Sequence, residues 1–237
     1  IFKPYKGSGY GGRGQFLYRE NYDRFFNTDL SIFKRDFKTF VDIGASRGYF
    51  STYMSSTFGC KTISIDLYQY AINDCKENLK LNNVFDGIFK VSAVGSNVDK
   101  GKFISLDKTD VPSRTSVLKA EIKTNDLTDS SFIRMTSIDE IVEEHNLSSV
   151  DMIKIDVEGY EKNVLYGALN TIERFRPLIY LEFKESKLEI LKFAKSKKYL
   201  SYLPTIKGNL IRINELEIAE NDYENIFLIP QENNLRL

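Results

Sequence analysis

Histidine is almost absent from this sequence, with His145 as its one representative among 237 residues. A nucleophile system of the Ser/His/Asp or Cys/His type needs a histidine in the site, and we expect His145, in "EEHNLSS", to lie at a helix end or on the surface. Cysteine is scarce as well. Cys60 and Cys75 provide neither a disulfide framework nor the spacing of a metal site, and both lie in patterns typical of core or helix. The small number of cysteines favours a reducing, cytoplasmic setting.

An excess of charge of either sign is also missing. Lys plus Arg (33) equals Asp plus Glu (33), so no overall field draws the chain toward nucleic acid or anionic lipid. No stretch approaches the roughly 18 unbroken apolar residues of a membrane helix. We therefore expect a soluble protein with no nucleic-acid and no membrane partner. The chain begins at Ile1 rather than methionine, which leaves open a longer polypeptide, and the oligomeric state is open too.

Short apolar strands alternate with helical patterns from residue 40 onward, and the length suits one sizeable core. The expected strands are "TFVDIG", "KTISIDL", "GIFKVSAVG", "VDMIKIDV", "LIYLEF", "GNLIRI" and "NIFLIP". Parallel strands need crossover connections, so the alternation predicts a doubly wound α/β domain with a mostly parallel seven-stranded sheet. The last two strands lack an intervening helix, which predicts an antiparallel hairpin at one edge.

Two regions depart from this alternation. Residues 1–39 contain the glycine-rich stretch "GSGYGGRG", and we expect this segment, with a helix, to cover the site of a single domain formed by residues 40–237. Residues 96–136 read as two strands, "GKFISLD" and "SFIRMTSID", around a polar loop. This insertion is expected either near the entrance for a substrate or as a solvated surface hairpin.

The turn in "FVDIGASRGYFS" is where a ligand would bind in such a sheet. A dinucleotide fold would offer G-x-G-x-x-G there, but Gly44 and Gly48 stand four apart and Ser46 takes the place of the middle glycine. The carboxylate of Asp42 would repel a phosphate and suit a cation. S-adenosylmethionine has an ammonium and a sulfonium and no phosphate, so Asp42 could meet it directly or through water, and Gly44 would give the backbone room to approach it.

The end of the second strand supplies another carboxylate. Asp66 lies where an acidic residue can accept both ribose hydroxyls, and adenine would lie near Ser92 and Ala93 at the end of the third strand. Simpler explanations exist for each piece: the glycine loop could be only a tight turn, and Asp66 only a helix cap. Together, Asp42, Gly44, Gly48 and Asp66 at two strand ends favour a nucleoside site.

The sequence resembles the FkbM family of S-adenosylmethionine-dependent methyltransferases over roughly residues 40–183. The motifs that carry the resemblance are "FVDIGASRGYFS", "SIDL", "MTSIDEI" and "VDMIKIDVEGYEKNVLYGALNTIERFRPLIYLEF". The resemblance implies a Rossmann-like class I methyltransferase fold and O-methylation of a hydroxyl on a saccharide or other small-molecule acceptor. The family's turn is usually A-N-x-G, and Ser46 replaces the asparagine. The expected cofactor-binding residues are Asp42, Gly44, Ala45, Ser46, Gly48, Tyr49, Phe50, Asp66, Leu67, Ser92, Ala93 and Asp156.

Three carboxylates are candidates for the chemistry. Asp156 and Glu182 end the fourth and fifth strands, and Glu158 follows just beyond. Asp156 or Glu158 could act as the general base for the acceptor hydroxyl, or Asp156 and Glu182 could bind a divalent cation such as Mg²⁺. Alternatively, Asp156 only positions the cofactor and Glu182 caps a helix. Two other functions stay open: an NAD(P)-dependent oxidoreductase, against which Asp42 and the missing glycine count, and a catalytically inert nucleoside-binding module.

Overall fold

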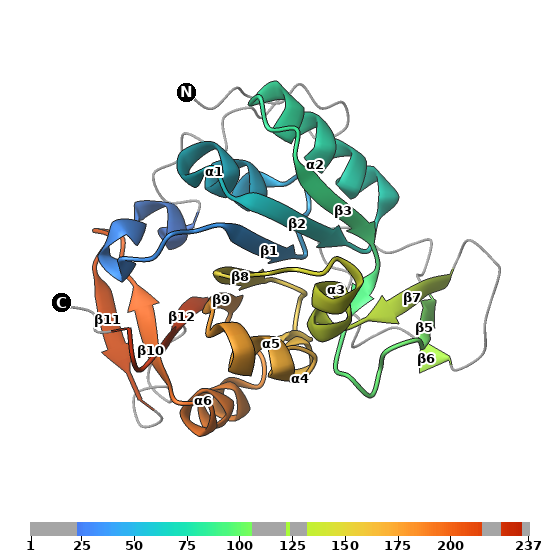
Figure 1. Ribbon diagram of the computed structural model, residues 1–237. Helices are drawn as coiled ribbons and strands as arrows, with labels where there is room; N and C mark the ends of the chain where they lie inside the picture. Colours follow the sequence, from blue (N-terminus) through green and yellow to red (C-terminus); the bar gives the residue numbers. More distant parts are fainter. Residues whose placement is uncertain (1–22, 106–121, 124–131, 215–223, 234–237) are drawn as a thin grey trace.

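An eight-stranded sheet forms the centre of the computed structural model, which describes residues 23–105, 122–123, 132–214 and 224–233 (Figure 1). The strand order is β11-β10-β12-β9-β8-β1-β2-β3, and the five strands from β9 to β3 are parallel. The strands are β1 (Thr39–Ile43), β2 (Lys61–Asp66), β3 (Gly87–Val91), β8 (Met152–Ile155), β9 (Leu178–Glu182), β10 (Tyr199–Pro204), β11 (Leu210–Ile213) and β12 (Asn225–Pro230).

Helices cover both faces of this sheet, as expected for a doubly wound domain (Figure 1). The one face carries α1 (Tyr49–Phe58), α2 (Gln69–Leu81) and the 3₁₀ helices η2 (Arg24–Asn27) and η3 (Leu30–Phe33). The other carries α3 (Ile138–Glu144), α4 (Glu161–Tyr166), α5 (Leu169–Phe175) and α6 (Lys187–Ser196). Both faces are apolar because strands buried on two sides have no solvated side to alternate with.

The antiparallel edge differs from the predicted hairpin. β11 and β12 do not pair with each other, because β10 lies between them and pairs antiparallel with both. β10 is also the strand that raises the number from the expected seven to eight. The mostly parallel sheet with an antiparallel edge is confirmed, but the direct pairing of the last two strands is wrong.

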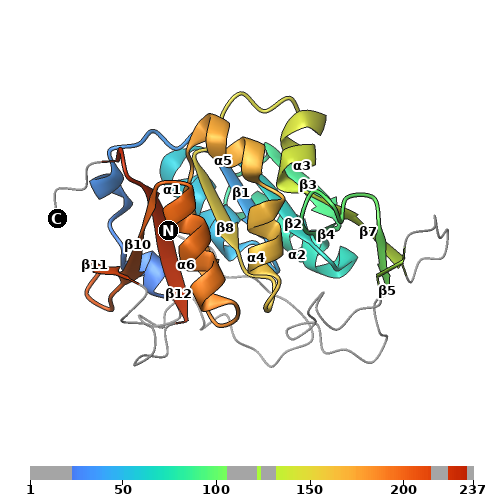
Figure 2. The same ribbon diagram turned by 90° about the horizontal axis from the view of Figure 1, so that it is seen from below.

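The predicted insertion, together with Ala93–Val94 from the end of the predicted third strand, forms a small second sheet beside the β3 end of the main one (Figures 1 and 2). Its order is β4-β7-β5-β6, and β5 and β7 pair antiparallel, as the two predicted strands suggested. The strands are β4 (Ala93–Val94), β5 (Phe103–Ser105), β6 (Ile122–Lys123) and β7 (Phe132–Thr136). Most of the polar loop between β5 and β7, like residues 1–22, lies outside the described residues.

Two local features show how the sequence sets the helices. Ser137 caps α3 by accepting a hydrogen bond from the Glu140 amide, and His145 is the C-cap of that helix. The apolar stripe from Val164 to Ile172 divides into α4 and α5 at Gly167. A Cβ on Gly167 would lie 2.0 Å from the carbonyl oxygen of Gly95, so the chain between the helices passes directly against a second backbone segment.

Candidate functional site

Three of the predicted carboxylates lie at one edge of the sheet. Asp66 ends β2, Glu182 ends β9 and Asp156 directly follows β8. These strands are parallel, so their carboxyl ends meet at the same edge. Ile155 is in register with Leu181, which makes Asp156 and Glu182 the next neighbours along the two strands. The structure therefore brings together the acids that chain order alone placed at strand ends.

The loop between β1 and α1 is built on left-handed backbone. Gly44 (φ +71°), Ser46 (φ +49°) and Gly48 (φ +75°) all have positive φ, a conformation that costs a non-glycine residue energy. A Cβ on Gly44 would lie 1.8 Å from the carbonyl oxygen of Asp156. The backbone that follows β8 therefore makes glycine necessary at this position, and the approach of a ligand to Gly44 stays a prediction.

Asp66 fastens this loop to the second strand. Its Oδ2 accepts a hydrogen bond from the Ser46 amide (2.9 Å), and its Oδ1 accepts one from the Tyr68 amide (3.0 Å). Burial raises the pKa of Asp66, and the two amide donors oppose this shift. The second bond orders the turn before α2, so part of the simpler explanation holds. The first bond places the Asp66 carboxylate beside the glycine loop, where the nucleoside was expected.

Asp42 has a different environment from the one predicted. Its side chain is completely buried, and Oδ2 accepts hydrogen bonds from the amide (3.2 Å) and hydroxyl (2.7 Å) of Ser51. Its Oδ1 lies 3.5 Å from the ammonium nitrogen of Lys154. The expectation that Asp42 meets a cationic cofactor directly is therefore wrong, because the positive charge beside it belongs to Lys154.

Lys154 belongs to a row of polar side chains that crosses the sheet. Ser64 on β2, Asp42 on β1, Lys154 on β8 and Tyr180 on β9 occupy successive register positions. Tyr180 donates its hydroxyl hydrogen bond to Asp23, the first described residue. Sequence reasoning missed Lys154; the available signal was a lysine inside the apolar run "MIKIDV".

Phe50 is not at the surface of the site either. It is buried in an aromatic cluster with Phe25, Phe26 and Tyr180, and its ring centroid lies 5.1 Å from the Lys154 ammonium. Its ring therefore packs beneath the loop, and its contact with the cofactor stays a prediction. Ala45 is buried as well, whereas Tyr49 is half-buried at the start of α1.

Apolar side chains line the region where adenine was predicted to bind. Ala93 packs with Ile104, Met135 and Tyr160, and Leu67 packs against this group. Ser92 is buried, and its hydroxyl donates to the carbonyl oxygens of Arg134 (2.7 Å) and Ala93 (3.0 Å). Ser92 therefore joins the main sheet to the small one, and Leu67 is the half-exposed member of the group.

The acidity of Glu182 is shifted toward neutral pH. Burial raises its pKa to about 7; the hydrogen bond from the Lys184 ammonium lowers it, and the carboxylates of Asp156 and Glu158 raise it further. The Asp156 side chain is 45% exposed, and its Oδ2 lies 3.5 Å from the Lys154 nitrogen. Glu158 is exposed, with φ +53°.

Glu161 was missed as a site residue. Its buried carboxylate accepts hydrogen bonds from the amides of Val157 (3.1 Å) and Gly159 (3.0 Å). It thereby holds the loop that carries Glu158, beyond the favourable interaction with a helix start that its position suggested. As for a metal, the described part of the chain contains no group of three or more His, Cys, Asp or Glu side chains arranged to hold one. Glu182 pairs with Lys184 instead.

The family of the chain follows from its sequence profile together with this geometry. The model of the Methyltransferase FkbM domain matches residues 42–204, from the end of β1 through β10. The chain belongs to this family. The resemblance seen in the motifs is thus confirmed. No curated protein matches it.

One solved structure with a TM-score of 0.50 agrees with this fold, and two others resemble the chain more weakly. The FkbM methyltransferase of Methylobacillus flagellatus KT has 14% identity and a TM-score of 0.50, over 81% of this chain and 44% of that one. A precorrin-6y C5,15-methyltransferase from Geobacter metallireducens GS-15 has 10% identity and a TM-score of 0.45, over 86% of this chain and 84% of that one. An rRNA methylase from Streptococcus thermophilus has 9% identity and a TM-score of 0.44, over 84% and 91%. The FkbM-family chain thus spans less than half of the Methylobacillus protein's length.

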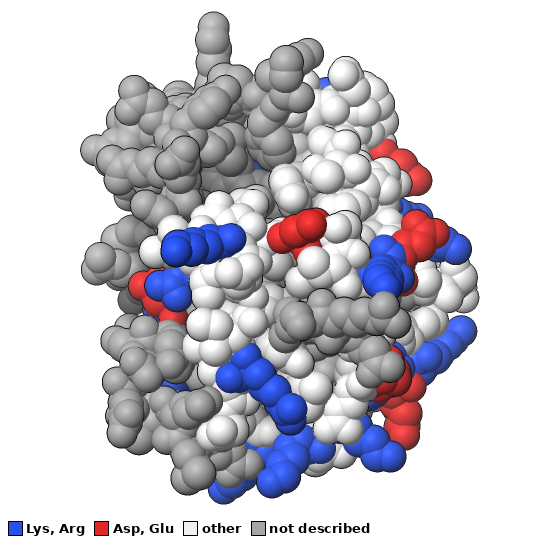
Figure 3. All heavy atoms as spheres, turned by 90° about the vertical axis from the view of Figure 1, so that its left-hand side faces the viewer, with Lys and Arg blue, Asp and Glu red and all other residues white. Residues whose placement is uncertain are grey.

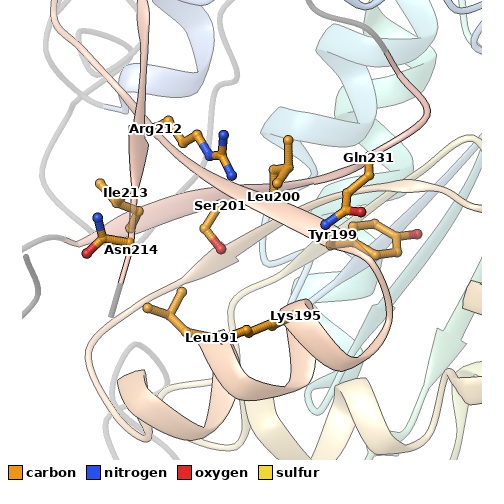
Figure 4. A pocket seen from close by; sticks show the side chains of 9 residues that line it. All are labelled: Leu191, Lys195, Tyr199, Leu200, Ser201, Arg212, Ile213, Asn214 and Gln231. Carbon is orange, nitrogen blue, oxygen red and sulfur yellow. The ribbon is translucent and has the colours of Figure 1, made fainter. Parts of the chain in front are cut away.

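A separate pocket of about 490 Å³ lies at the opposite edge of the sheet (Figure 4). Its described lining comes from α6, the start of β10, the end of β11 and Gln231, which follows β12. Lys and Arg side chains are spread over the described part of the molecule's β11 side (Figure 3). This hollow is remote from the strand ends that carry Asp66, Asp156 and Glu182, so it is not the candidate active site.

Among the described helices, none combines the length and hydrophobicity needed to cross a membrane.

Proposed function

We propose that this FkbM-family protein transfers the methyl group of S-adenosylmethionine to a hydroxyl oxygen of a small-molecule or saccharide acceptor. The observation that carries the proposal is the shared sheet edge, where the Asp66–Ser46 turn lies on one side and the neighbouring carboxylates Asp156 and Glu182 on the other. A nucleoside end and a reacting end of one cofactor can be accommodated along such an edge.

The cofactor half of the edge suits an adenosine. In the proposed complex the Asp66 carboxylate accepts hydrogen bonds from the ribose hydroxyls, and the half-exposed Leu67 contacts the adenine. The methionine end lies at the boundary with the acceptor half, near Gly44 and Asp156, where the half-exposed Asp156 carboxylate attracts the ammonium or sulfonium. S-adenosylmethionine supplies an electrophilic methyl group when bound.

The acceptor half supplies a base. A general base works best when its pKa is near the working pH, and the pKa of Glu182, raised by burial to about 7, meets this condition. The bound cofactor would supply the methyl group to the acceptor oxygen, and Glu182 would take the hydroxyl proton of the acceptor. Asp156 then has a positioning role toward the cofactor, and Glu158 is the alternative base.

An oxidoreductase and an inert nucleoside-binding module have less support. The argument that Asp42 repels a pyrophosphate loses force because Asp42 is buried against Lys154, but membership of a methyltransferase family now counts against an oxidoreductase. An inert nucleoside-binding module would leave Glu182 without a role. The exclusion of nucleic acid as an acceptor and the cytoplasmic setting remain predictions.

Two measurements test the proposal. Calorimetry with S-adenosylhomocysteine and, separately, NAD identifies the cofactor, and binding of NAD alone would reject methyl transfer. Incubation with deuterated-methyl S-adenosylmethionine and panels of sugars, other hydroxyl compounds and RNA, read by product mass, identifies the acceptor. Repeating the assay in chelator and again with Mg²⁺ restored tests the metal hypothesis. Methylated RNA as the sole product would overturn the proposed acceptor class, and cofactor binding without any product would favour the inert module.

A further inference from the structure

A buried lysine joins the two loops of the candidate site. The ammonium of Lys154 donates a hydrogen bond to the Gly44 carbonyl oxygen in the loop after β1 (2.8 Å). The same nitrogen lies 3.5 Å from Asp156 Oδ2 in the loop after β8. The loop after β8 also meets the end of β1 directly, since the Asp156 amide donates to the Ile43 carbonyl oxygen (3.1 Å). Lys154 therefore contacts both the loop proposed to hold the cofactor and the carboxylate proposed to face its methionine end.

The Lys154 ammonium lies closer to the loop after β1 than to either carboxylate. The ammonium is at hydrogen-bonding distance from Gly44 but 3.5 Å from both carboxylates. Asp42 Oδ1 is buried and has no hydrogen-bond donor among the described residues. If Lys154 served only to neutralise Asp42, a closer contact with that oxygen would be expected, because a buried charge is stabilised by hydrogen bonding as well as by charge.

Lys154 keeps its charge in this position. Burial lowers the pKa of Lys154, but the carboxylates of Asp156 and Asp42, with further contributions from other nearby aspartates, outweigh burial and leave the pKa above the ordinary value. A pair of apolar residues of similar size in place of Lys154 and Asp42 would often be as stable as a buried ion pair. The stability of the core alone therefore does not account for a lysine here.

We propose that Lys154 is a positioning residue for methyl transfer, holding the Gly44 carbonyl and the Asp156 carboxylate in one fixed arrangement. This inference rests on the proposed function. Methyl transfer requires the acceptor oxygen, methyl carbon and sulfur to be in line, and a displacement of about 1 Å can reduce a rate by on the order of a hundredfold. The lysine acts on this alignment through the two loops and does not contact the substrate.

The test compares two charge-matched double variants, because Lys154→Met alone would leave the Asp42 carboxylate buried without its cation. D42N/K154M removes both charges and the donor to Gly44, whereas D42N/K154Q removes both charges but keeps a neutral donor of similar size. Thermal unfolding establishes that each variant folds. Calorimetry with S-adenosylhomocysteine gives the affinity, and the acceptor found in the mass-detected assay gives kcat and KM.

We expect D42N/K154M to bind S-adenosylhomocysteine roughly tenfold more weakly and to lose about a hundredfold in kcat with little change in the KM for the acceptor. D42N/K154Q should recover part of both losses. Equal losses in the two variants, or wild-type values in both, would overturn the positioning role. If D42N/K154M does not fold, D42N/K154Q is compared with wild type, and wild-type kcat in that variant overturns the direct charge link to Asp156. A wild-type protein that binds no S-adenosylhomocysteine would instead reject the proposed function itself.

Discussion

The carboxylates on the two halves of the site are held by different kinds of partner. On the cofactor half, Asp66 accepts hydrogen bonds from two backbone amides. On the acceptor half, the partners of Asp156 and Glu182 are the ammonium groups of Lys154 and Lys184. Backbone donors fix a carboxylate in one place, whereas the partly exposed Lys184 can move and leave Glu182 to change its protonation. The first half is suited to holding a constant ligand and the second to proton transfer.

The largest effect is expected where the two halves touch. Gly44→Ala would place a methyl group 1.8 Å from the Asp156 carbonyl oxygen and should destabilise the fold by about 4 kcal/mol or more. Gly59→Ala is the matched control, since Gly59 also has positive φ (+69°) but has no atom within 4 Å of a Cβ; it should cost about 1–2 kcal/mol. Denaturant unfolding measures both. Similar losses would show that backbone conformation, and not the contact with Asp156, makes glycine necessary.

Glu182→Gln should lower kcat by roughly 10²–10⁴-fold. In the wild type, kcat should rise as pH increases through about 7, because the deprotonated carboxylate is the base. This rise should be missing from Glu182→Gln and retained in Glu185→Gln, which changes an exposed glutamate nearby. A larger loss in Glu158→Gln than in Glu182→Gln would move the base to Glu158.

The same carboxyl group should make stability depend on pH. Its folded-state pKa of about 7 lies above the ordinary value of 4.5, so between these values the folded protein binds more protons than the unfolded chain. The contribution of Glu182 to stability therefore falls as pH rises from 4.5 to 7. The melting temperature of the wild type minus that of Glu182→Gln should therefore be lower at pH 8 than at pH 5. An unchanged difference between the two melting temperatures would mean that Lys184 keeps Glu182 ionised throughout.

Asp66→Ala tests the cofactor half. Losing the ribose hydrogen bonds should weaken S-adenosylhomocysteine binding by about tenfold to a hundredfold in calorimetry. Part of this loss would come from the loop, because the Ser46 amide also loses its acceptor. Asp66→Asn, which keeps an acceptor oxygen, should lose less. Unchanged affinity in Asp66→Ala would place the ribose elsewhere.

The smallest effect concerns the residue that departs from the family's usual turn. Ser46 has φ +49°, and asparagine tolerates this left-handed conformation better than serine. Ser46→Asn should stabilise the protein by about 0.5 kcal/mol, which corresponds to a rise of about 1–2 °C in melting temperature for a chain of this size. A lower melting temperature would indicate that the serine makes contacts that asparagine cannot replace.

Chain order was enough to predict the parallel core and the acids at its edge, because both depend on local alternation and on strand direction. It was not enough for the antiparallel edge. In β10, "YLSYLP" follows a helix without a clear break and contains a serine and a proline, which weaken the strand pattern. Its position between β11 and β12 depends on pairing across long sequence separations.

The burial of individual side chains could not be predicted from the sequence either. Asp42 and Phe50 were expected to meet the cofactor, but Phe25 and its neighbours pack over Phe50, and Lys154 reaches Asp42 from a strand more than a hundred residues away. Local spacing identifies which strand end a residue occupies. Whether the residue faces the ligand or lies beneath the loop depends on parts of the chain that are distant in sequence.

The polar row across β2, β1, β8 and β9 also constrains how the sheet can assemble. Side chains alternate between faces, so sliding β8 by one residue against β1 would move Lys154 into the apolar layer that now contains Ile153 and Ile155. An ammonium there would have lost Asp42 and gained only hydrocarbon neighbours, an arrangement with a large energetic penalty. Parallel strands that are apolar on both faces otherwise have little to distinguish one alignment from the next. In this protein the buried pair of Lys154 and Asp42 favours the correct alignment of the central strands.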